Sequence, residues 1–193
     1  MPQTAPSLRR RNRLATMRLV QEASVTLMED RGFDTTTIEE IAGTSGVSAS
    51  TIYRLFGTKE NVVLWDERDD VIDAELGNRL RHDPPMKAFR DAVVSGLAER
   101  EDRGLFLRRL TLVYSAPSIW AAAAHHDRIA RSELAAAIAA TAGRAQANMT
   151  DMIIAAACLA ALDVALDEWQ AHSGAQQLGD LIDQAIGAIA SLA

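Results

Sequence analysis

The sequence predicts an all-α protein of about nine helices, and three observations lead to that fold class. Apolar residues recur at helical spacing in each long segment between breaks rich in Gly, Pro and Ser. No segment has the alternation of apolar and polar residues that indicates a strand. The segment 149–172 is dense in alanine, the residue that favours helices most. We expect an N-terminal three-helix unit followed by a C-terminal helical bundle.

The first helix is expected over residues 13–30, where Val20, Leu27 and Met28 belong to one apolar stripe. The basic run 9–13 before it either continues an irregular N-terminal arm or begins this helix. Gly32 ends the helix, because glycine tolerates the backbone conformations that terminate helices.

Two short helices follow, and their capping signals place them. Thr37 and Glu40 form a capping box that begins a helix at about residue 38. The glycine Gly46 suits a sharp turn, and Ser48 caps a second helix over 49–55. Two short helices joined by a tight glycine-containing turn form a helix-turn-helix unit.

The outward face of the second short helix carries small or hydrogen-bonding residues and no acid, as a helix entering a DNA major groove requires. The arginines before the first helix could contact phosphates or a minor groove. Lys59 stands at the start of the next helix, where its ammonium and the helix amides are well placed to hold a phosphate. The candidate DNA-binding residues are Arg10, Arg11, Thr37, Ser48, Ala49, Ser50, Thr51, Tyr53, Arg54 and Lys59.

The charge distribution supports this interpretation although the net charge is −6. Residues 1–60 hold eight Lys and Arg against seven Asp and Glu, and the acidic excess lies in residues 61–193. Residues 1–20 hold five arginines and no acid. The positive charge is therefore concentrated beside the helix-turn-helix, where phosphates would bind.

The segment 32–62 resembles the DNA-binding domain of TetR-family transcriptional regulators. The matching residues are Gly32, Phe33, Thr36, Thr37, Ile38, Ile41, Ala42, Gly46, Val47, Ser48, Thr51, Ile52, Tyr53, Phe56, Lys59 and Glu60. Two positions depart from the pattern: Ser45 stands where alanine is common, and Leu55 stands where the family often has His or Tyr. The resemblance implies a homodimeric repressor of a palindromic operator, released by a small effector.

The remaining helices are expected at 59–81, 86–101, 105–114, 149–172 and 176–192, with one kinked helix or two over 119–142. The clearest break is at Asp83-Pro84-Pro85. We assign residues 1–60 to the N-terminal arm and helix-turn-helix domain, and residues 61–193 to a helical effector-binding and dimerisation domain.

Large apolar residues gather among alanines in the middle of the chain, and such a mixture can leave a small-molecule cavity in a helical bundle. Each of them could also simply fill the core. The candidate ligand-binding residues are Phe89, Phe106, Leu110, Val113, Tyr114, Trp120, Met152, Leu162 and Trp169. Segments at 64–66, 108–110 and 167–169 resemble a TetR subgroup with acyl-CoA-like ligands, which implies that Arg108 or Arg109 meets phosphates.

The last two helices carry wide apolar faces and many small residues, including Ala155, Ala160 and Ala165. Small residues let helices approach closely, so these faces could pack on the chain's own core or on a second copy. Because a helix-turn-helix commonly reads two half-sites, we expect a homodimer through these helices.

The sequence gives little support for an enzyme. His125 and His126 are adjacent and point about 100° apart, so they are poorly placed to share a metal, and Asp127 is expected to cap a helix. We expect no metal, cofactor or catalytic residue. The single Cys158 is expected in the core, and without a signal segment or apolar membrane run we expect a cytoplasmic protein without a membrane partner. Alternatives to a repressor are an activator or ligand-independent regulator of the same fold, and more distantly a helical enzyme.

Overall fold

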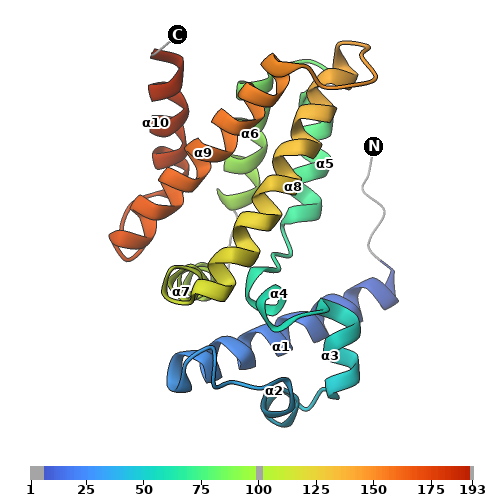
Figure 1. The fold of residues 1–193 in the computed structure, drawn as a ribbon, viewed down its shortest axis with the longest axis vertical. Coiled ribbons are helices and arrows are strands. Elements are labelled where there is room, and N and C mark those ends of the chain that lie inside the picture. Colours follow the sequence, from blue (N-terminus) through green and yellow to red (C-terminus); the bar gives the residue numbers. More distant parts are fainter. Residues whose placement is uncertain (1–6, 99–101, 192–193) are drawn as a thin grey trace. The chain divides into compact units, whose positions relative to one another are not determined.

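A computed structural model describes residues 7–98 and 102–191, and it has no strand within these ranges (Figure 1). The helices in this part of the chain are α1 Leu8–Arg31, α2 Ile38–Ser45, α3 Ala49–Phe56, α4 Lys59–Leu64, α5 Asp69–Arg79, α6 Pro85–Ala98, α7 Arg103–Ser115, α8 Pro117–Thr141, α9 Met149–Ala171 and α10 Leu178–Ser191. The all-α fold class is therefore confirmed.

The chain forms two compact units. Unit 1 comprises Met1–Trp65 and Arg108–Ala122, and unit 2 comprises Asp66–Leu107 and Ala123–Ala193. Both α7 and α8 contribute residues to each unit, so the chain passes between the units several times.

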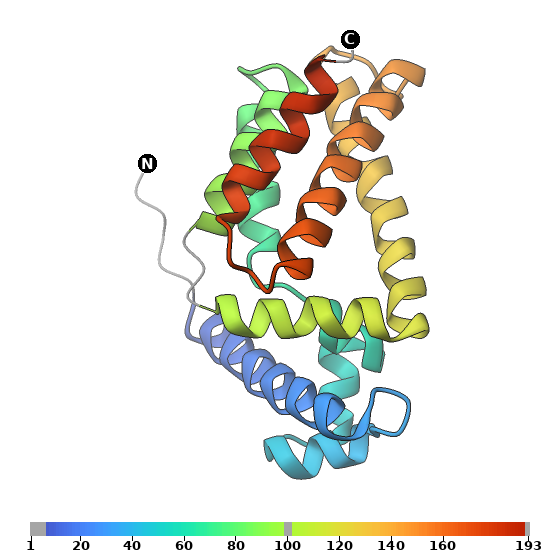
Figure 2. The ribbon, with the colours of Figure 1, turned by 90° about the vertical axis from the view of Figure 1, so that its left-hand side faces the viewer.

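The core of unit 1 forms where α1 packs against α2 and α4, and α3 packs against α2 and α4. Val20, Ile41, Ile52 and Val62 are fully buried there, one from each of these four helices. The second half of α7 also belongs to this unit, and the ribbon of α7 passes close to that of α1 (Figure 2). Arg108 Nε of α7 donates to both carboxylate oxygens of Glu29 of α1 at 2.9 Å.

The expected helix 59–81 is wrong, because the structure has two helices there. The carbonyl of Val62 accepts a 2.8 Å hydrogen bond from Gln21 Nε2, and the carbonyl of Val63 accepts a 2.7 Å bond from Arg109 Nε. These donors satisfy the carbonyls at the end of α4, so the helix need not continue. Asp66 then accepts from the Arg68 amide at 2.9 Å, and the chain turns into α5.

Two other regions decide between the alternatives that the sequence left open. The basic run 9–13 is helical, because Ser7 caps α1 by accepting from the Arg10 amide at 3.3 Å. The region 117–141 is a single helix, so Asp127 lies inside α8 and is not a cap. The expected ends at Glu101 and Leu192 lie outside the described residues.

Unit 2 is built on α6, α9 and α10, which pack on one another, with α5 against α6. Phe106 of α7 and the fully buried Trp169 of α9 form an aromatic pair with ring centroids 5.6 Å apart. The Trp169 indole donates to the Gln176 carbonyl at 3.1 Å, which fixes the turn between α9 and α10. Gly174 has a φ of 71° in this turn, and a Cβ there would lie 3.1 Å from the Trp169 ring.

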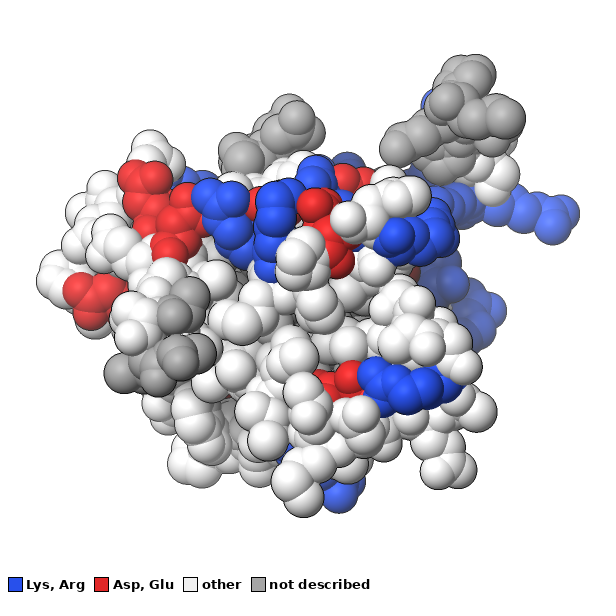
Figure 3. All heavy atoms as spheres, turned by 90° about the horizontal axis from the view of Figure 1, so that it is seen from above, with Lys and Arg blue, Asp and Glu red and all other residues white. Residues whose placement is uncertain are grey.

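Charged residues of unit 2 pair across its helices. Arg90 of α6 forks Asp183 of α10, with Nε to Oδ1 at 2.6 Å and Nη2 to Oδ2 at 2.8 Å, which raises the pKa of Arg90. Lys87 binds both Asp83 and Asp91. On the face drawn in Figure 3, acidic and basic side chains lie next to one another, and much of the surface is uncharged.

Helix α9 is long and apolar, although the sequence was expected to contain no apolar segment of membrane-spanning length. Among the described residues it alone has the length and composition of a membrane span, with a mean hydropathy of 1.9 in its most apolar window. Its alanines raise this value, and a core helix of a soluble protein can pass the same test. One face of α9 packs on α6 and α10. Cys158 is buried there as predicted, and burial raises the pKa of its thiol to about 12.

Candidate nucleic-acid interface and effector residues

The turn between α2 and α3 has the geometry that the sequence predicts for a helix-turn-helix. Gly46 adopts the left-handed conformation with φ 69° and ψ 12°, and its amide donates to the Ala42 carbonyl at 3.0 Å. Ser48 then caps α3 by accepting from the Thr51 amide at 3.3 Å. Because Ile52 and Phe56 are buried, the opposite face of α3 is directed outward.

The outward face of α3 is polar and uncharged at its N-terminal end. Ser48, Ser50 and Tyr53 are exposed, and Ala49 and Thr51 are half-buried. The Ser48 hydroxyl shares hydrogen bonds with the Ser50 hydroxyl at 3.2 Å and with the Thr51 hydroxyl at 2.9 Å. Hydroxyl groups can donate or accept, so this cluster can adapt to the base edges of a groove.

Thr37, another predicted contact, is exposed but already bonded. Its amide donates to Glu40 Oε2 at 2.9 Å, its hydroxyl donates to the same atom at 3.0 Å, and it accepts from the Glu40 amide. These bonds lower the pKa of Glu40, the backbone bond from Thr37 being the largest cause. Thr37 therefore fixes the start of α2, and a DNA contact by Thr37 stays a prediction.

The predicted phosphate contact Lys59 has an additional structural role. Its ammonium donates to the carbonyls of Phe33 at 2.6 Å and Thr36 at 2.7 Å, and it lies 4.1 Å from the centroid of the Phe33 ring. Two of its three protons are thus used to hold the α1–α2 turn against the start of α4. One proton remains for a phosphate.

Replacing Lys59 with methionine is expected to destabilise unit 1 by about 1–3 kcal/mol, the cost of losing charged hydrogen bonds to carbonyls. Thermal unfolding of the variant and the wild type measures this. Lys87→Met is the control, because the Lys87 side chain is 52% exposed and its surface ion pairs contribute little. Equal melting of the Lys59 variant and the wild type, together with weaker DNA binding, would contradict the structural role and favour a phosphate contact.

A hollow of about 420 Å³ lies between α1 and α3. Its lining residues are Asn12, Arg13, Thr16, Thr51, Arg54 and Leu55. Arg13 and Arg54 are exposed, so two guanidinium groups from different helices border one hollow beside the outward face of α3. The predicted contacts Arg10 and Arg11 are exposed on the first turn of α1.

Of the residues that line this hollow, the sequence predicts Thr51 and Arg54 as DNA contacts, and Asn12 and Arg13 belong to the basic run 9–13 that could lie along phosphates or enter a minor groove. Thr16 is the residue that sequence reasoning missed. The spacing of four residues places Asn12 and Thr16 on one side of a helix only if α1 begins before residue 13, and the sequence alone leaves that start open. The Ser7 cap signal, serine followed by helix-forming residues, could have decided it.

The nine candidate ligand-binding residues do not all belong to one unit. Leu110, Val113, Tyr114 and Trp120 lie in unit 1, and Phe89, Phe106, Met152, Leu162 and Trp169 lie in unit 2. Phe89, Phe106 and Trp169 are buried, whereas Tyr114, Trp120 and Met152 are exposed. Tyr114 and Trp120 form a pair with centroids 5.8 Å apart. A shared ligand site for the nine stays a prediction.

The two arginines expected near acyl-CoA phosphates are engaged within unit 1. Arg108 is bound to Glu29, and Arg109 is 5% exposed and donates to the carbonyls of Val63 and Leu64. No group of three or more potential metal ligands occurs in the described part of the chain. His125 contacts Arg128 through Nδ1 at 3.3 Å, and the rings of His125 and His126 are 6.4 Å apart.

Comparisons with known proteins agree with this architecture. A family model of bacterial regulatory proteins of the tetR family matches residues 21–64, and a model of the MftR C-terminal domain matches residues 83–192. The second match alone covers more than half of the chain. The comparison with curated proteins gives no match.

Three solved structures are similar to this chain. A TetR-family regulator of Mesorhizobium loti is 18% identical, with a TM-score of 0.54 over 93% of this chain and 97% of that one. A TetR-family regulator of Streptomyces coelicolor is 19% identical, with a TM-score of 0.51 over 96% and 99%. The repressor FadR of Thermus thermophilus, in complex with lauroyl-CoA, is 19% identical, with a TM-score of 0.49 over 88% and 91%. The first two similarities concern the fold, and the lauroyl-CoA belongs to the Thermus protein.

Proposed function

The chain belongs to the TetR family of bacterial transcriptional regulators, and from this premise we propose that it is a cytoplasmic, homodimeric repressor that binds a palindromic operator and releases it when a small effector binds. The proposed effector is apolar or acyl-CoA-like. The proposal includes the boundary near residue 60 between the DNA-binding and effector-binding domains, and it assigns no enzymatic activity.

The observation that carries the DNA-binding part is the combination of α3 with its neighbouring hollow. The uncharged hydroxyls and Tyr53 on α3 suit base edges, whereas Arg13 and Arg54 at the hollow suit phosphates. Phosphate contacts would fix the position of α3 on the duplex, and side chains of α3 would then read sequence. We assign Tyr53, which is 51% exposed, as a base contact.

The dimer part is supported by an apolar face on α9. Met149, Met152, Ile153 and Val164 are 76%, 51%, 61% and 61% exposed. Met149, Ile153, Ala160 and Val164 recur at spacings of four, seven and four residues, which places them on one side of the helix. So much exposed apolar surface on one helix indicates a protein interface, and we propose that a second copy covers it.

The effector part is supported by the large apolar residues of the C-terminal region. The buried pair of Phe106 and Trp169 borders the α9–α10 turn, and Phe89 is buried on α6. An effector that enters among such residues releases DNA only if it binds the DNA-incompetent arrangement more tightly than the competent one.

The experiment that tests the proposed function is binding of the purified protein to the DNA flanking its own gene, at two salt concentrations, with and without a long-chain acyl-CoA. We expect tight, salt-sensitive binding to one palindrome, weakened by acyl-CoA but not by coenzyme A alone. Tyr53→Ala should weaken this binding without changing the folded dimer. Binding that ignores acyl-CoA would reject this effector class, and weak binding that is equal for every sequence would reject the local operator.

A further inference from the structure

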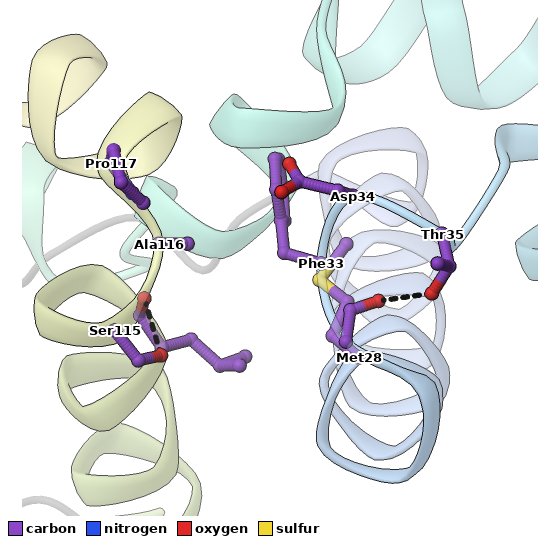
Figure 4. A pocket seen from close by; sticks show the side chains of 9 residues that line it. Met28, Phe33, Asp34, Thr35, Ser115, Ala116 and Pro117 are labelled. Atoms are coloured by element: carbon purple, nitrogen blue, oxygen red, sulfur yellow. Dashed lines mark hydrogen bonds between the residues drawn. The ribbon is translucent and has the colours of Figure 1, made fainter.

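A second hollow, of about 340 Å³, lies within unit 1 between the end of α1 with its following turn and the corner where α7 meets α8. Figure 4 shows the labelled side chains of Phe33, Asp34 and Thr35 on one side and those of Ser115 and Pro117 on the other. Neither the ten candidate DNA contacts nor the nine candidate effector residues line it. It is therefore a site that the proposed function does not use.

The floor of this hollow is apolar. Met28, Phe33, Leu112 and Ala116 line it and are 1%, 6%, 6% and 7% exposed, and Pro117 adds a further apolar wall. These side chains come from α1, the α1–α2 turn, and the α7–α8 corner. A ligand with an apolar body would bury its surface against them and gain the usual hydrophobic free energy.

The polar side chains at the edge of the hollow all act as acceptors. The Thr35 hydroxyl donates its proton to the Arg31 carbonyl, and the Ser115 hydroxyl donates to the Leu112 carbonyl at 3.2 Å. Each hydroxyl has only one proton, so its free lone pairs can only accept. Asp34 is an acceptor as a carboxylate, and no described residue forms a hydrogen bond or ion pair with it.

The two cationic side chains of this region, Lys59 and Arg31, bind other groups and not Asp34. The Lys59 ammonium donates to the carbonyls of Phe33 and Thr36 and lies over the Phe33 ring. Arg31 pairs with Asp30 and Glu40. The exposed carboxylate of Asp34 thus forms no ion pair with either of these cations, and Figure 4 shows it on the same side of the hollow as Phe33.

We propose that this hollow binds a small organic cation, a protonated amine with an apolar or aromatic body. The ammonium would donate to the Asp34 carboxylate, with the Thr35 or Ser115 oxygen at the edge as a further acceptor, and the body would lie on Met28, Phe33 and Leu112. The volume is at the low end of the range of about 300–1,000 Å³ for ligand pockets, which favours an amine with one ring or a short chain. The site is separate from the proposed operator and effector residues, so its test needs no DNA.

The test is calorimetric titration of the full-length protein with 2-phenylethylamine at neutral pH, where this amine is protonated. We expect one ligand per chain, and at least fivefold weaker binding of the neutral isostere 2-phenylethanol. Asp34→Asn, which keeps the shape and removes the charge, should weaken amine binding at least fivefold. Asp30→Asn is the matched control, because Asp30 is exposed on α1 but does not line the hollow, and it should stay within twofold of the wild type.

A second measurement locates the ligand. In amide NMR spectra, 2-phenylethylamine should shift the signals of Phe33, Thr35 and Leu112, and Ser115→Leu, which fills the exposed edge of the hollow, should remove these shifts. The proposal is overturned if the amine does not bind, if the alcohol binds equally well, if Asp34→Asn binds like Asp30→Asn, or if the shifts lie elsewhere. A loss of operator binding in the separate DNA experiment would leave this result unchanged.

Discussion

Replacing both Ile153 and Val164 with glutamate is expected to convert the protein from a dimer to a monomer. Both side chains are 61% exposed in the single chain, so glutamates there cost the folded monomer little. In the proposed dimer, four carboxylates would be buried in an apolar interface without partners, at a cost of several kcal/mol. A cost of about 4 kcal/mol corresponds to a dissociation constant raised roughly 1,000-fold.

Analytical ultracentrifugation at micromolar concentration measures this change directly, and circular dichroism checks that the helices remain. Ala140→Glu is the control, because Ala140 is an exposed alanine on α8, outside the apolar face of α9. We expect this variant to remain dimeric. A double glutamate variant that still sediments as a dimer would exclude the α9 face as the interface.

The monomer should also lose most of its operator affinity. Each chain carries one helix-turn-helix, and a palindromic operator gains much of its affinity from two heads bound together. The double glutamate variant leaves every candidate DNA contact in unit 1 unchanged. A loss of operator binding in this variant would therefore result from the separation of the two helix-turn-helix units, and not from any change in the residues that contact DNA.

The local signals of the helix-turn-helix could be predicted from the sequence because they depend on neighbours in the chain. Thr37 with Glu40, Gly46 and Ser48 act within three or four residues of their partners, and the structure has each of these caps. Capping rules describe such short-range bonds. The two short helices followed from these rules, whereas the all-α fold class followed from the helical spacing of apolar residues.

The break between α4 and α5 could not be predicted in this way, because its cause is distant in sequence. Gln21 lies 41 residues before the Val62 carbonyl that it binds, and Arg109 lies 46 residues after Val63. The periodic pattern of residues 59–81 contains no sign of these donors. A local signal was nevertheless present, because Asp66 followed by acids at 69 and 70 is typical of a helix start.

The effector residues show a similar limit. Closeness in sequence grouped Phe106 with Tyr114, but α7 passes from unit 2 to unit 1 between them. Composition indicates that large apolar residues are present and does not show which of them face one another. The hollow between α1 and α3 could not be predicted for a related reason, because Arg13 and Arg54 are 41 positions apart in the sequence and border one hollow only through the packing of unit 1.

Replacing both Arg13 and Arg54 with glutamine is expected to lower operator affinity roughly 100- to 1,000-fold at low salt. A dimer would lose four phosphate contacts, and exposed ion pairs are each worth up to about 1 kcal/mol, so the total is about 3–4 kcal/mol. Each released phosphate contributes about 0.9 to the slope of log affinity against log salt. The magnitude of the slope should therefore fall by roughly 3–4, with little change in the preference for one sequence over another.

Arg18→Gln separates this effect from a general loss of positive charge. Arg18 is on α1 as well, but five residues after Arg13, so it lies about 140° around the helix and does not line the hollow. Binding titrations over a range of salt concentrations should give Arg18→Gln a slope close to that of the wild type. Arg18→Gln and the variant that lacks both Arg13 and Arg54 could instead reduce the affinity and its salt dependence by the same amount per charge removed. In that case Arg13 and Arg54 would act through net charge alone, and the hollow would not be a phosphate site. If only the double variant lowered the slope, the hollow would hold the backbone on both half-sites, and α3 beside it would be the element that reads the bases.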